Sequence, residues 1–255
     1  MALLSSVRKA LKILETFSAN QPELGVTEIS RILNSHKSSI ARILTTLVSE
    51  GFVEKSPHTS KYRLGLKLAD LGSRVLGRYD LHGHADPYME ALARELGEII
   101  HLSVLDKHEI VYIDKKGEGQ TLTVATKIGG RNPAHASAMG KILLSGLSQK
   151  ELADLLAIGP LVQCTVNTIT DVPKLLGEIE QVRKQGFAVD DEESFPGIRC
   201  VAAPVYDSKG KPIAAISATV PTQRMGKQRM NEIREKVVKA ARLISERIGM
   251  SGLGG

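Results

Sequence analysis

The sequence predicts an α+β protein with two unlike parts, a small N-terminal helical unit ending in a hairpin and a larger C-terminal unit of antiparallel sheet and helices. Three observations lead to this fold class. Apolar residues recur at helical spacing through the first fifty positions, and short β-rich runs joined by turn residues dominate the second half. The length of 255 residues suits one large or two smaller domains.

Three helices are expected in the N-terminal part. The first covers residues 6–18 and places its apolar side chains on one stripe: Val7, Ala10, Leu11, Leu14 and Phe17. Thr27 is expected to cap a short second helix. The third helix begins after Ser35 or His36 and ends at Gly51. Its periodicity is the clearest in the chain: Ile40, Ile43, Leu44, Leu47 and Val48.

A hairpin and a linking helix follow. Strands are predicted at 52–55 and 62–66, joined by a loop of turn residues, and helical periodicity returns from about 66 to 83. The predicted domains are therefore an N-terminal unit of helices and a hairpin over 1–66, a connecting helix over 67–83 and a second domain over 84–250.

The remainder of the chain alternates helices with β-rich runs. Helices are expected at about 86–97, 137–157, 172–186 and 228–248. Strands are expected at 101–105, 110–113, 121–124, 187–190, 200–206 and 213–219. The short connections at 106–108, 117–119 and 208–211 suit hairpins, which favours an antiparallel sheet.

The positive charge is concentrated at the N-terminal end. Residues 1–80 carry 12 Lys and Arg against 7 Asp and Glu, which accounts for +5 of the net charge of +6. Cations that gather in one third of a chain are typical of a polyanion partner, because they attract phosphates and release condensed counterions. A merely solvated basic surface is the alternative.

Composition indicates the compartment. No apolar run approaches the ~18 residues of a membrane span, and no secretory leader is visible at the N-terminus. The two cysteines, Cys164 and Cys200, are too few for a disulfide framework. We therefore expect a cytoplasmic protein with no membrane partner.

The outer face of the third predicted helix suits a DNA groove. Opposite its buried stripe lie small hydroxyl residues and one arginine: Ser38, Ser39, Arg42 and Thr45. Small side chains admit the helix deeply into the major groove, and one Arg can read a guanine with two hydrogen bonds. In the hairpin, Lys61 and Tyr62 are the residues predicted to hold the DNA backbone.

These motifs resemble the IclR family of bacterial transcription regulators over nearly the full length of the chain. The N-terminal resemblance lies in 7–14 (VRKALKIL), 28–33 (EISRIL), 38–47 (SSIARILTTL), 51–53 (GFV) and 62–65 (YRLG). The C-terminal resemblance lies in 133–144 (PAHASAMGKILL), 190–194 (DDEES), 197–205 (GIRCVAAPV) and 214–220 (AAISATV). It implies a winged helix-turn-helix that binds double-stranded DNA and a GAF-like effector domain that binds small organic acids. It also implies dimers that pair into tetramers, and a dimer predicts a near-palindromic operator.

The same resemblance implies an effector pocket. Residues 134–140 are read as an extended segment turning into a helix at Ser137, whose free amides at Ala138, Met139 and Gly140 favour a carboxylate. The implied pocket positions are Ala138, Met139, Asp190, Ile198, Cys200, Ser217 and Thr219. Of the acidic run 190–193, only Asp190 is expected to turn inward.

Other chemistries are weaker. His82, His84 and His101 lack a neighbouring Cys or carboxylate at evident ligand spacing, and the one metal set worth testing combines His135 with Asp190 and Cys200. A Cys200 nucleophile paired with His135 has no identifiable oxyanion site. We expect no catalysed reaction, cofactor or metal. The alternative is a small-molecule enzyme or binding protein whose N-terminal module contacts other proteins.

Overall fold

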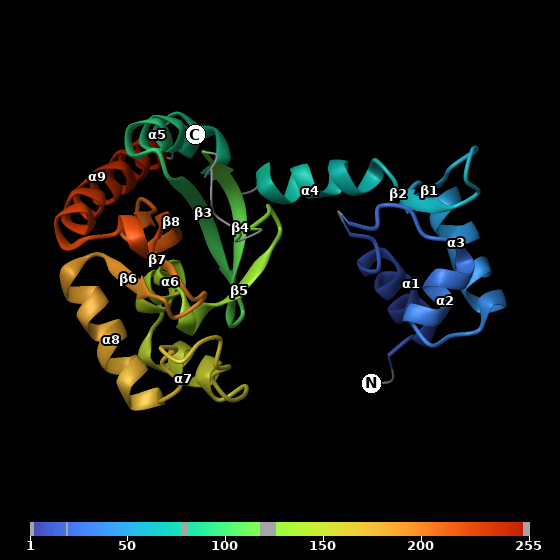
Figure 1. Cartoon of the computed structure of the whole chain (residues 1–255), viewed down its shortest axis with the longest axis horizontal. Coiled ribbons are helices and arrows are strands. Elements are labelled where there is room, and N and C mark those ends of the chain that lie inside the picture. Colours follow the sequence, from blue (N-terminus) through green and yellow to red (C-terminus); the bar gives the residue numbers. More distant parts are fainter. Residues whose placement is uncertain (1–2, 19, 78–80, 118–125, 252–255) are drawn as a thin grey trace. The chain divides into compact units, whose positions relative to one another are not determined.

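The computed structural model of the chain describes residues 3–18, 20–77, 81–117 and 126–251 (Figure 1). The chain divides into two compact units, Met1–Tyr79 and Asp80–Gly255. The predicted strand at 121–124 and the turn at 118–119 lie outside the described residues.

The N-terminal unit contains four helices and a two-stranded hairpin. In chain order these are α1 (Ser5–Glu15), α2 (Val26–Ile32), α3 (Lys37–Ser49), β1 (Val53–Lys55), β2 (Tyr62–Leu64) and α4 (Lys67–Gly77). The antiparallel hairpin pairs Val53 with Leu64 and Lys55 with Tyr62. Its core is built from α1, α2, α3 and the hairpin: Ile13, Leu24, Ile29, Ile40, Leu44, Leu47 and Val53.

The structure adds one detail to the predicted stripe of α1 and corrects the predicted cap of α2. Val7 and Leu11 of that stripe are 52% and 57% exposed, whereas Ile13, outside it, is fully buried. The cap of α2 is Gly25, not Thr27, because the Glu28 carboxylate accepts the Gly25 N–H at 2.6 Å. A carboxylate three positions into a helix thus satisfies the backbone amide of the residue that caps it.

The C-terminal unit is a six-stranded sheet in the order β5-β4-β3-β8-β7-β6, in which all the paired neighbours are antiparallel. The strands are β3 (Ile99–Asp106), β4 (Glu109–Lys116), β5 (Arg131–Pro133), β6 (Ala188–Asp191), β7 (Ile198–Tyr206) and β8 (Pro212–Pro221). The hairpins expected at 106–108 and 208–211 are confirmed as the β3–β4 and β7–β8 turns.

Helices cover both faces of this sheet. α5 (Leu81–Leu96) and α9 (Lys227–Ser251) pack against each other and against the sheet (Figure 1). On the other face, α6 (Ala138–Ser145) lies on the sheet and contacts α8 (Val172–Gln185), while α7 (Gln149–Leu156) follows α6. The predicted α+β class with an antiparallel, GAF-like second unit is confirmed.

Several boundaries differ from the prediction. The helix expected at 137–157 is two helices, because Ser148 starts α7 with a capping box to Glu151. The predicted connecting helix is α4 up to Gly77, and Gly83 already belongs to α5, which continues through Pro87. Short 3₁₀ helices, Ala134–Ala136 and Thr222–Arg224, precede α6 and α9, so the segment expected to be extended before α6 is instead helical.

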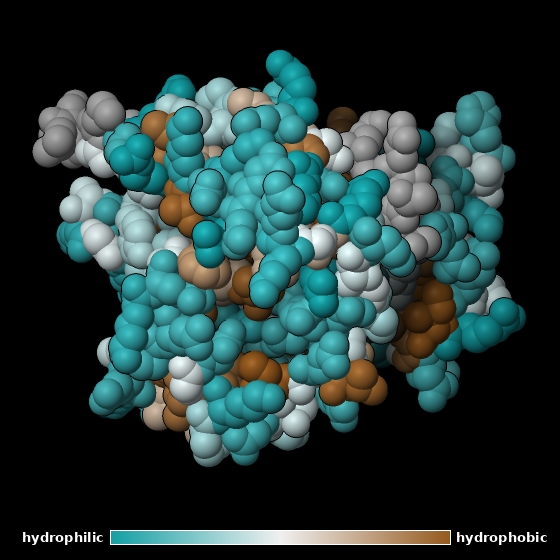
Figure 2. Space-filling model, turned by 60° about the vertical axis from the view of Figure 1, so that its left-hand side comes forward, coloured by the Kyte–Doolittle hydropathy of each residue, from teal (hydrophilic) through white to brown (hydrophobic). Residues whose placement is uncertain are grey.

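None of the helices among the described residues combines the length and apolarity that a membrane crossing requires. On the face drawn in Figure 2, hydrophilic residues cover most of the surface and hydrophobic residues gather in small separate patches.

Candidate DNA-binding surface and effector pocket

The outer face of α3 is open to solvent. Ser38, Arg42 and Thr45 are exposed and Ser39 is half-buried, whereas Ile40 and Leu44 on the opposite face are fully buried. Arg42 makes no ion pair with any residue that the structure describes, so its guanidinium keeps its donors for a partner. The Thr45 hydroxyl donates to the Ala41 carbonyl at 3.0 Å and retains its acceptor lone pairs and methyl group.

A groove between α1 and α3 extends this surface. It has a volume of about 530 Å³, and α1 contributes Ser5, Ser6 and Lys9 to its lining beside Ser38 and Arg42. Sequence reasoning missed the α1 residues, although hydroxyls in a first helical turn followed by a lysine are a recognisable anion-binding pattern. Hydroxyls and two cations around one open groove suit a phosphate backbone.

The two predicted wing residues have structural partners within the unit. Lys61 Nζ lies 3.1 Å from Glu28 Oε1, and the Gly25 amide together with Lys61 holds the pKa of Glu28 below its usual range. Tyr62 exchanges two 2.9 Å backbone hydrogen bonds with Leu24, and its ring packs against the core. Lys61 therefore ties the hairpin to α2 while remaining at the surface.

All seven predicted effector positions line one cavity in the C-terminal unit. Sequence reasoning missed six further lining residues: Tyr112, Thr126, Asn132, Ser137, Ser194 and Phe195. The cavity measures about 20 Å³, room for about one water molecule. Any larger occupant requires its walls to separate.

Asp190 is held by backbone amides at one end of the cavity. It is 2% exposed, and its Oδ1 accepts the amides of Glu193 at 2.7 Å and Ser194 at 3.3 Å. Burial nevertheless raises the pKa of Asp190 to about 6, since these hydrogen bonds only partly offset desolvation. The carboxyl group is therefore easily protonated within the folded protein.

The hydroxyl groups of Ser217 and Thr219 on β8 differ in whether a protein group already occupies them. Thr219 Oγ1 lies 3.1 Å from His101 Nδ1, and His101 Nε2 lies 2.7 Å from Thr126 Oγ1. Burial lowers the pKa of His101 to about 3, so this ring is neutral at physiological pH. Ser217 is fully buried and its Oγ has no hydrogen-bond partner among the described residues. A buried hydroxyl without a partner is costly and predisposes the site to a ligand acceptor.

The start of α6 forms another wall. The Ser137 hydroxyl accepts the Gly140 N–H at 3.1 Å, so the expectation of a free Gly140 amide was wrong. The amides of Ala138 and Met139 lie at the positive helix end. A Cβ at Gly140 would lie 2.0 Å from the Ala134 carbonyl oxygen, which explains the glycine in this tight turn.

The acidic run beside the pocket is more buried than predicted. Glu193 is 7% exposed, and its Oε1 lies 2.7 Å from Nζ of Lys141, which is 1% exposed. Lys141 also lies 3.3 Å from Glu178 of α8. A single buried cation on α6 thus anchors the loop that positions Asp190, and the expectation that only Asp190 turns inward was wrong.

The structure does not bring the proposed metal set together. His135 Nε2 lies 2.9 Å from the Val162 carbonyl oxygen and borders a separate hollow of about 250 Å³. Asp190 and Cys200 line the effector cavity instead. The same separation removes the pairing of Cys200 with His135 as a nucleophile and base. Burial and the nearby Asp190 carboxylate raise the pKa of the Cys200 thiol above its usual range, which disfavours the thiolate that a nucleophile requires.

Comparison with known proteins connects both surfaces to one family. The family model of the IclR helix-turn-helix domain matches residues 6–57, and that of the bacterial transcriptional regulator IclR C-terminal domain matches residues 73–246. The chain is 36% identical over 250 residues to the HTH-type transcriptional regulator XynR of Escherichia coli, covering 98% of this chain and 99% of that protein.

Solved structures share the fold. The crystal structure of IclR from Thermotoga maritima matches with a TM-score of 0.81 and 32% identity, over 96% of this chain and 98% of that one. An IclR homologue from Microbacterium hydrocarbonoxydans, solved in complex with 4-hydroxybenzoate, matches with a TM-score of 0.83 and 24% identity, over 96% and 99% of the two chains. The relatives are transcriptional regulators and not enzymes, in agreement with the expectation that the chain catalyses no reaction. The chain therefore belongs to the IclR family of transcriptional regulators, with an N-terminal helix-turn-helix DNA-binding domain and a C-terminal effector-binding domain.

Proposed function

We propose that the chain is a sequence-specific regulator whose DNA affinity is set by a small organic acid bound in the cavity at the start of α6. The observation that carries this proposal is the buried hydroxyl of Ser217, which has no hydrogen-bond partner in the described part of the chain and lines the same cavity as the positive end of α6. A carboxylate would accept hydrogen bonds from that hydroxyl and from the amides of Ala138 and Met139.

The remaining walls define the class of acid. Asp190, whose carboxyl group is easily protonated, can pair with a hydroxyl of the ligand, while Met139 and Ile198 supply apolar contacts. Cys200 and Thr219 complete the lining beside Ser217. The 4-hydroxybenzoate bound to the M. hydrocarbonoxydans homologue is an acid with a hydroxyl group, which supports this class.

On the DNA side, the proposal assigns base edges or phosphates to the exposed face of α3, and the backbone to the wing. The residues are Ser38, Ser39, Arg42 and Thr45 on α3, and Lys61 and Tyr62 in the hairpin. The proposed domain limits remain 1–66, 67–83 and 84–250. A cytoplasmic location follows, since the proposed partner is the bacterial chromosome.

Self-association is part of the proposal. Apolar side chains of α4 and α1 are exposed: Leu71, Val75, Val7 and Leu11 are between 38% and 57% exposed. Exposed apolar stripes on two helices favour contact with a second copy. A dimer would place two α3 helices about 34 Å apart on a near-palindromic operator, and two dimers would form a tetramer. A ligand changes DNA affinity only if it binds one arrangement of the two reading helices more tightly than another.

The experiment measures DNA binding by the full chain, using DNA from upstream of its own gene, in the presence of paired carboxylates and amides. The pairs are acetate with acetamide, glycolate with glycolamide, and 4-hydroxybenzoate with 4-hydroxybenzamide. We expect at least one acid, and not its neutral amide, to shift DNA affinity and to raise the midpoint of thermal unfolding.

Ser217→Ala should weaken the affinity for that acid by roughly 10–150-fold, the usual loss for a hydrogen bond to a charged group. Ser208→Ala, in the exposed β7–β8 turn, is the matched control and should leave it unchanged. Equal responses to acid and amide, or an unaltered response in Ser217→Ala, would place the effector elsewhere.

A further inference from the structure

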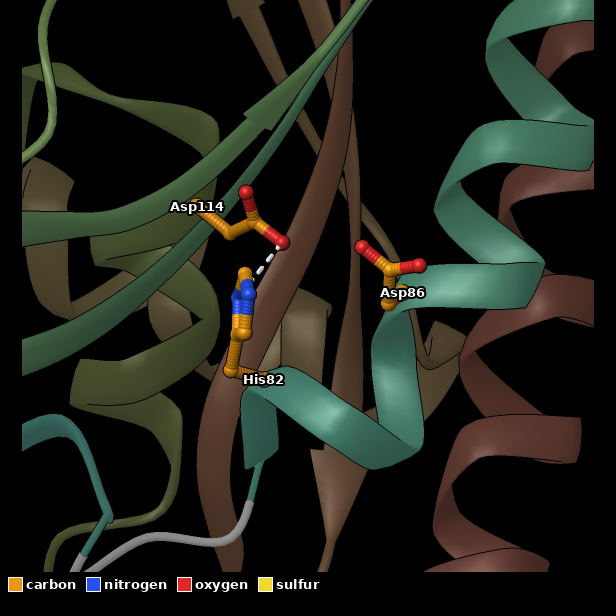
Figure 3. A group of neighbouring side chains, drawn as sticks. All are labelled: His82, Asp86 and Asp114. Carbon is orange, nitrogen blue, oxygen red and sulfur yellow. Dashed lines mark ion pairs between the residues drawn. The ribbon is translucent and has the colours of Figure 1, made fainter.

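Three potential metal ligands converge away from the effector cavity. His82 and Asp86 lie one helical turn apart near the start of α5, and Asp114 lies on β4. Each offers one ligand atom, and these atoms all lie within 4.8 Å of one another. Figure 3 shows the three side chains pointing toward one shared space. In the described part of the chain, no other group of three His, Cys, Asp or Glu residues comes this close.

The floor of this group is a buried carboxylate with an unsatisfied oxygen. The Asp114 side chain is 3% exposed, and its Oδ1 accepts the Lys115 amide at 2.7 Å. Its Oδ2 lies 2.9 Å from His82 Nδ1, at ion-pair distance (dashed line in Figure 3), but accepts no aligned hydrogen bond from any described residue. Because that contact is not an aligned hydrogen bond, the lone pairs of both atoms can turn to a cation held between them.

We infer that His82, Asp86 and Asp114 form a divalent-metal site of the zinc class. One imidazole nitrogen and two carboxylate oxygens are a ligand set that Zn²⁺ accepts, whereas Mg²⁺ and Ca²⁺ prefer oxygen alone. The His82 and Asp86 side chains are 55% and 47% exposed, so water can complete the coordination shell. The metal would join the start of α5 to β4.

Lys116 limits the affinity of this site. Its Nζ lies 2.7 Å from Asp86 Oδ1 and 3.5 Å from Asp114 Oδ1, and it holds the pKa of Asp86 below the usual range. These contacts engage the two Oδ1 atoms and leave the Asp114 Oδ2 atom facing His82. Because the ammonium repels an incoming dication, removing it should strengthen metal binding.

The test is a calorimetric titration of the untagged full chain with Zn²⁺, repeated with Co²⁺ while its visible absorption is recorded. We expect one equivalent per chain, a higher midpoint of thermal unfolding with metal, and no thiolate-to-cobalt charge-transfer band from Cys164 or Cys200. His82→Gln and Asp86→Asn, at half-exposed positions that should not disturb folding, should each weaken binding at least tenfold.

Two further variants make the result decisive. Lys116→Gln should bind the metal more tightly than the wild type, whereas His58→Gln, at an exposed position in the wing loop, should bind it unchanged. No saturable binding by the wild type would overturn the inference. Binding that survives both His82→Gln and Asp86→Asn, or that weakens in Lys116→Gln, would also overturn it.

Discussion

The reading face of α3 and the effector cavity both present hydroxyl groups, but under opposite conditions. Ser38 and Thr45 are exposed to solvent, where leaving a hydroxyl without a protein partner costs little. Arg42 beside them makes no ion pair with any described residue. Ser217 and Asp190 are buried, so each polar group needs a partner or loses stability. The α3 face therefore needs no partner for its polar groups before DNA binds. In the effector cavity, by contrast, the Ser217 hydroxyl has no acceptor among the described residues, and a ligand would supply one.

This difference predicts that DNA binding and effector binding respond to different changes in conditions. A surface of exposed cations and hydroxyls recognises a polyanion chiefly through charge, so salt weakens it. A desolvated cavity recognises a small molecule through individual hydrogen bonds, so single atoms and protons decide its affinity. Changes in salt, pH and side chains therefore separate the two regions.

The largest expected effect is that of salt on DNA binding. If a dimer neutralises about eight phosphates, log affinity should fall against log salt with a slope near −7, or about 10⁴-fold between 50 and 200 mM. Fluorescence anisotropy with upstream DNA measures the slope. Ser217→Ala, in the effector cavity, should give the same slope as the wild type. A slope near zero would contradict the DNA-binding assignment of the α3 face.

The next effect is a pH dependence that originates in the cavity. Burial raises the pKa of Asp190 from its ordinary value of 3.8 to about 6, so the folded state holds this proton more tightly than the unfolded state. The contribution of Asp190 to the free energy of unfolding is then full below about pH 4 and falls as pH rises to about 6. The loss is on the order of 2–3 kcal/mol.

Urea denaturation between pH 4 and 7.5 measures this contribution as the difference between wild type and Asp190→Asn. Asp154→Asn, at an exposed position on α7, is the control for the substitution itself. A difference for Asp190→Asn that does not change with pH would mean that Asp190 is as acidic when folded as when unfolded.

A smaller effect is expected from the guanidinium of α3. Arg42→Ala should cost about 1–3 kcal/mol of specific binding if Arg42 contacts a base with two hydrogen bonds. The difference in affinity between operator and unrelated DNA should therefore become smaller. Competition binding with both DNAs measures this difference. Arg94→Ala, at an exposed position on α5, should change neither affinity. Unaltered discrimination in Arg42→Ala would remove Arg42 from the reading set.

The smallest effect concerns the wing. Lys55 has no acidic partner among the described residues, whereas Lys61 must leave Glu28 to reach a phosphate. Because both chains of the dimer carry the substitution, alanine at either position should reduce the salt slope by about 1.8. The loss of affinity should be smaller for Lys61→Ala because its ion pair is given up on binding. Lys209→Ala, in an exposed turn of the C-terminal unit, is the control. An unchanged slope in Lys61→Ala would exclude Lys61 from the DNA contacts.

The third helix and the paired strands of the sheet could be predicted because their signals are local. The spacing of Ile40, Leu44 and Leu47 defines a buried stripe, and the residues opposite it must face solvent in a small helical unit. The short turns between β3 and β4 and between β7 and β8 likewise required antiparallel pairing.

The partners of charged side chains could not be predicted in this way. Glu28 and Lys61 are 33 positions apart, Lys141 and Glu193 are 52 apart, and these contacts exist only once strands and helices are assembled. The three potential metal ligands combine a contact that the sequence predicts with one that it does not. His82 and Asp86 have a helical i, i+4 spacing that the sequence displays, so the expectation that His82 lacks a carboxylate at ligand spacing was wrong. Asp114 joins them only through the packing of α5 against β4.

The residue pattern alone determined the family, the antiparallel pairing of the sheet and the side of α3 that faces solvent, because periodicity and turn chemistry act within a few residues of the chain. Only the folded structure decided that Ser217 lacks a hydrogen-bond partner among the described residues, and that Glu193 is buried and paired with Lys141. Those properties depend on burial and on contacts between distant segments, and both arise from packing across the whole domain.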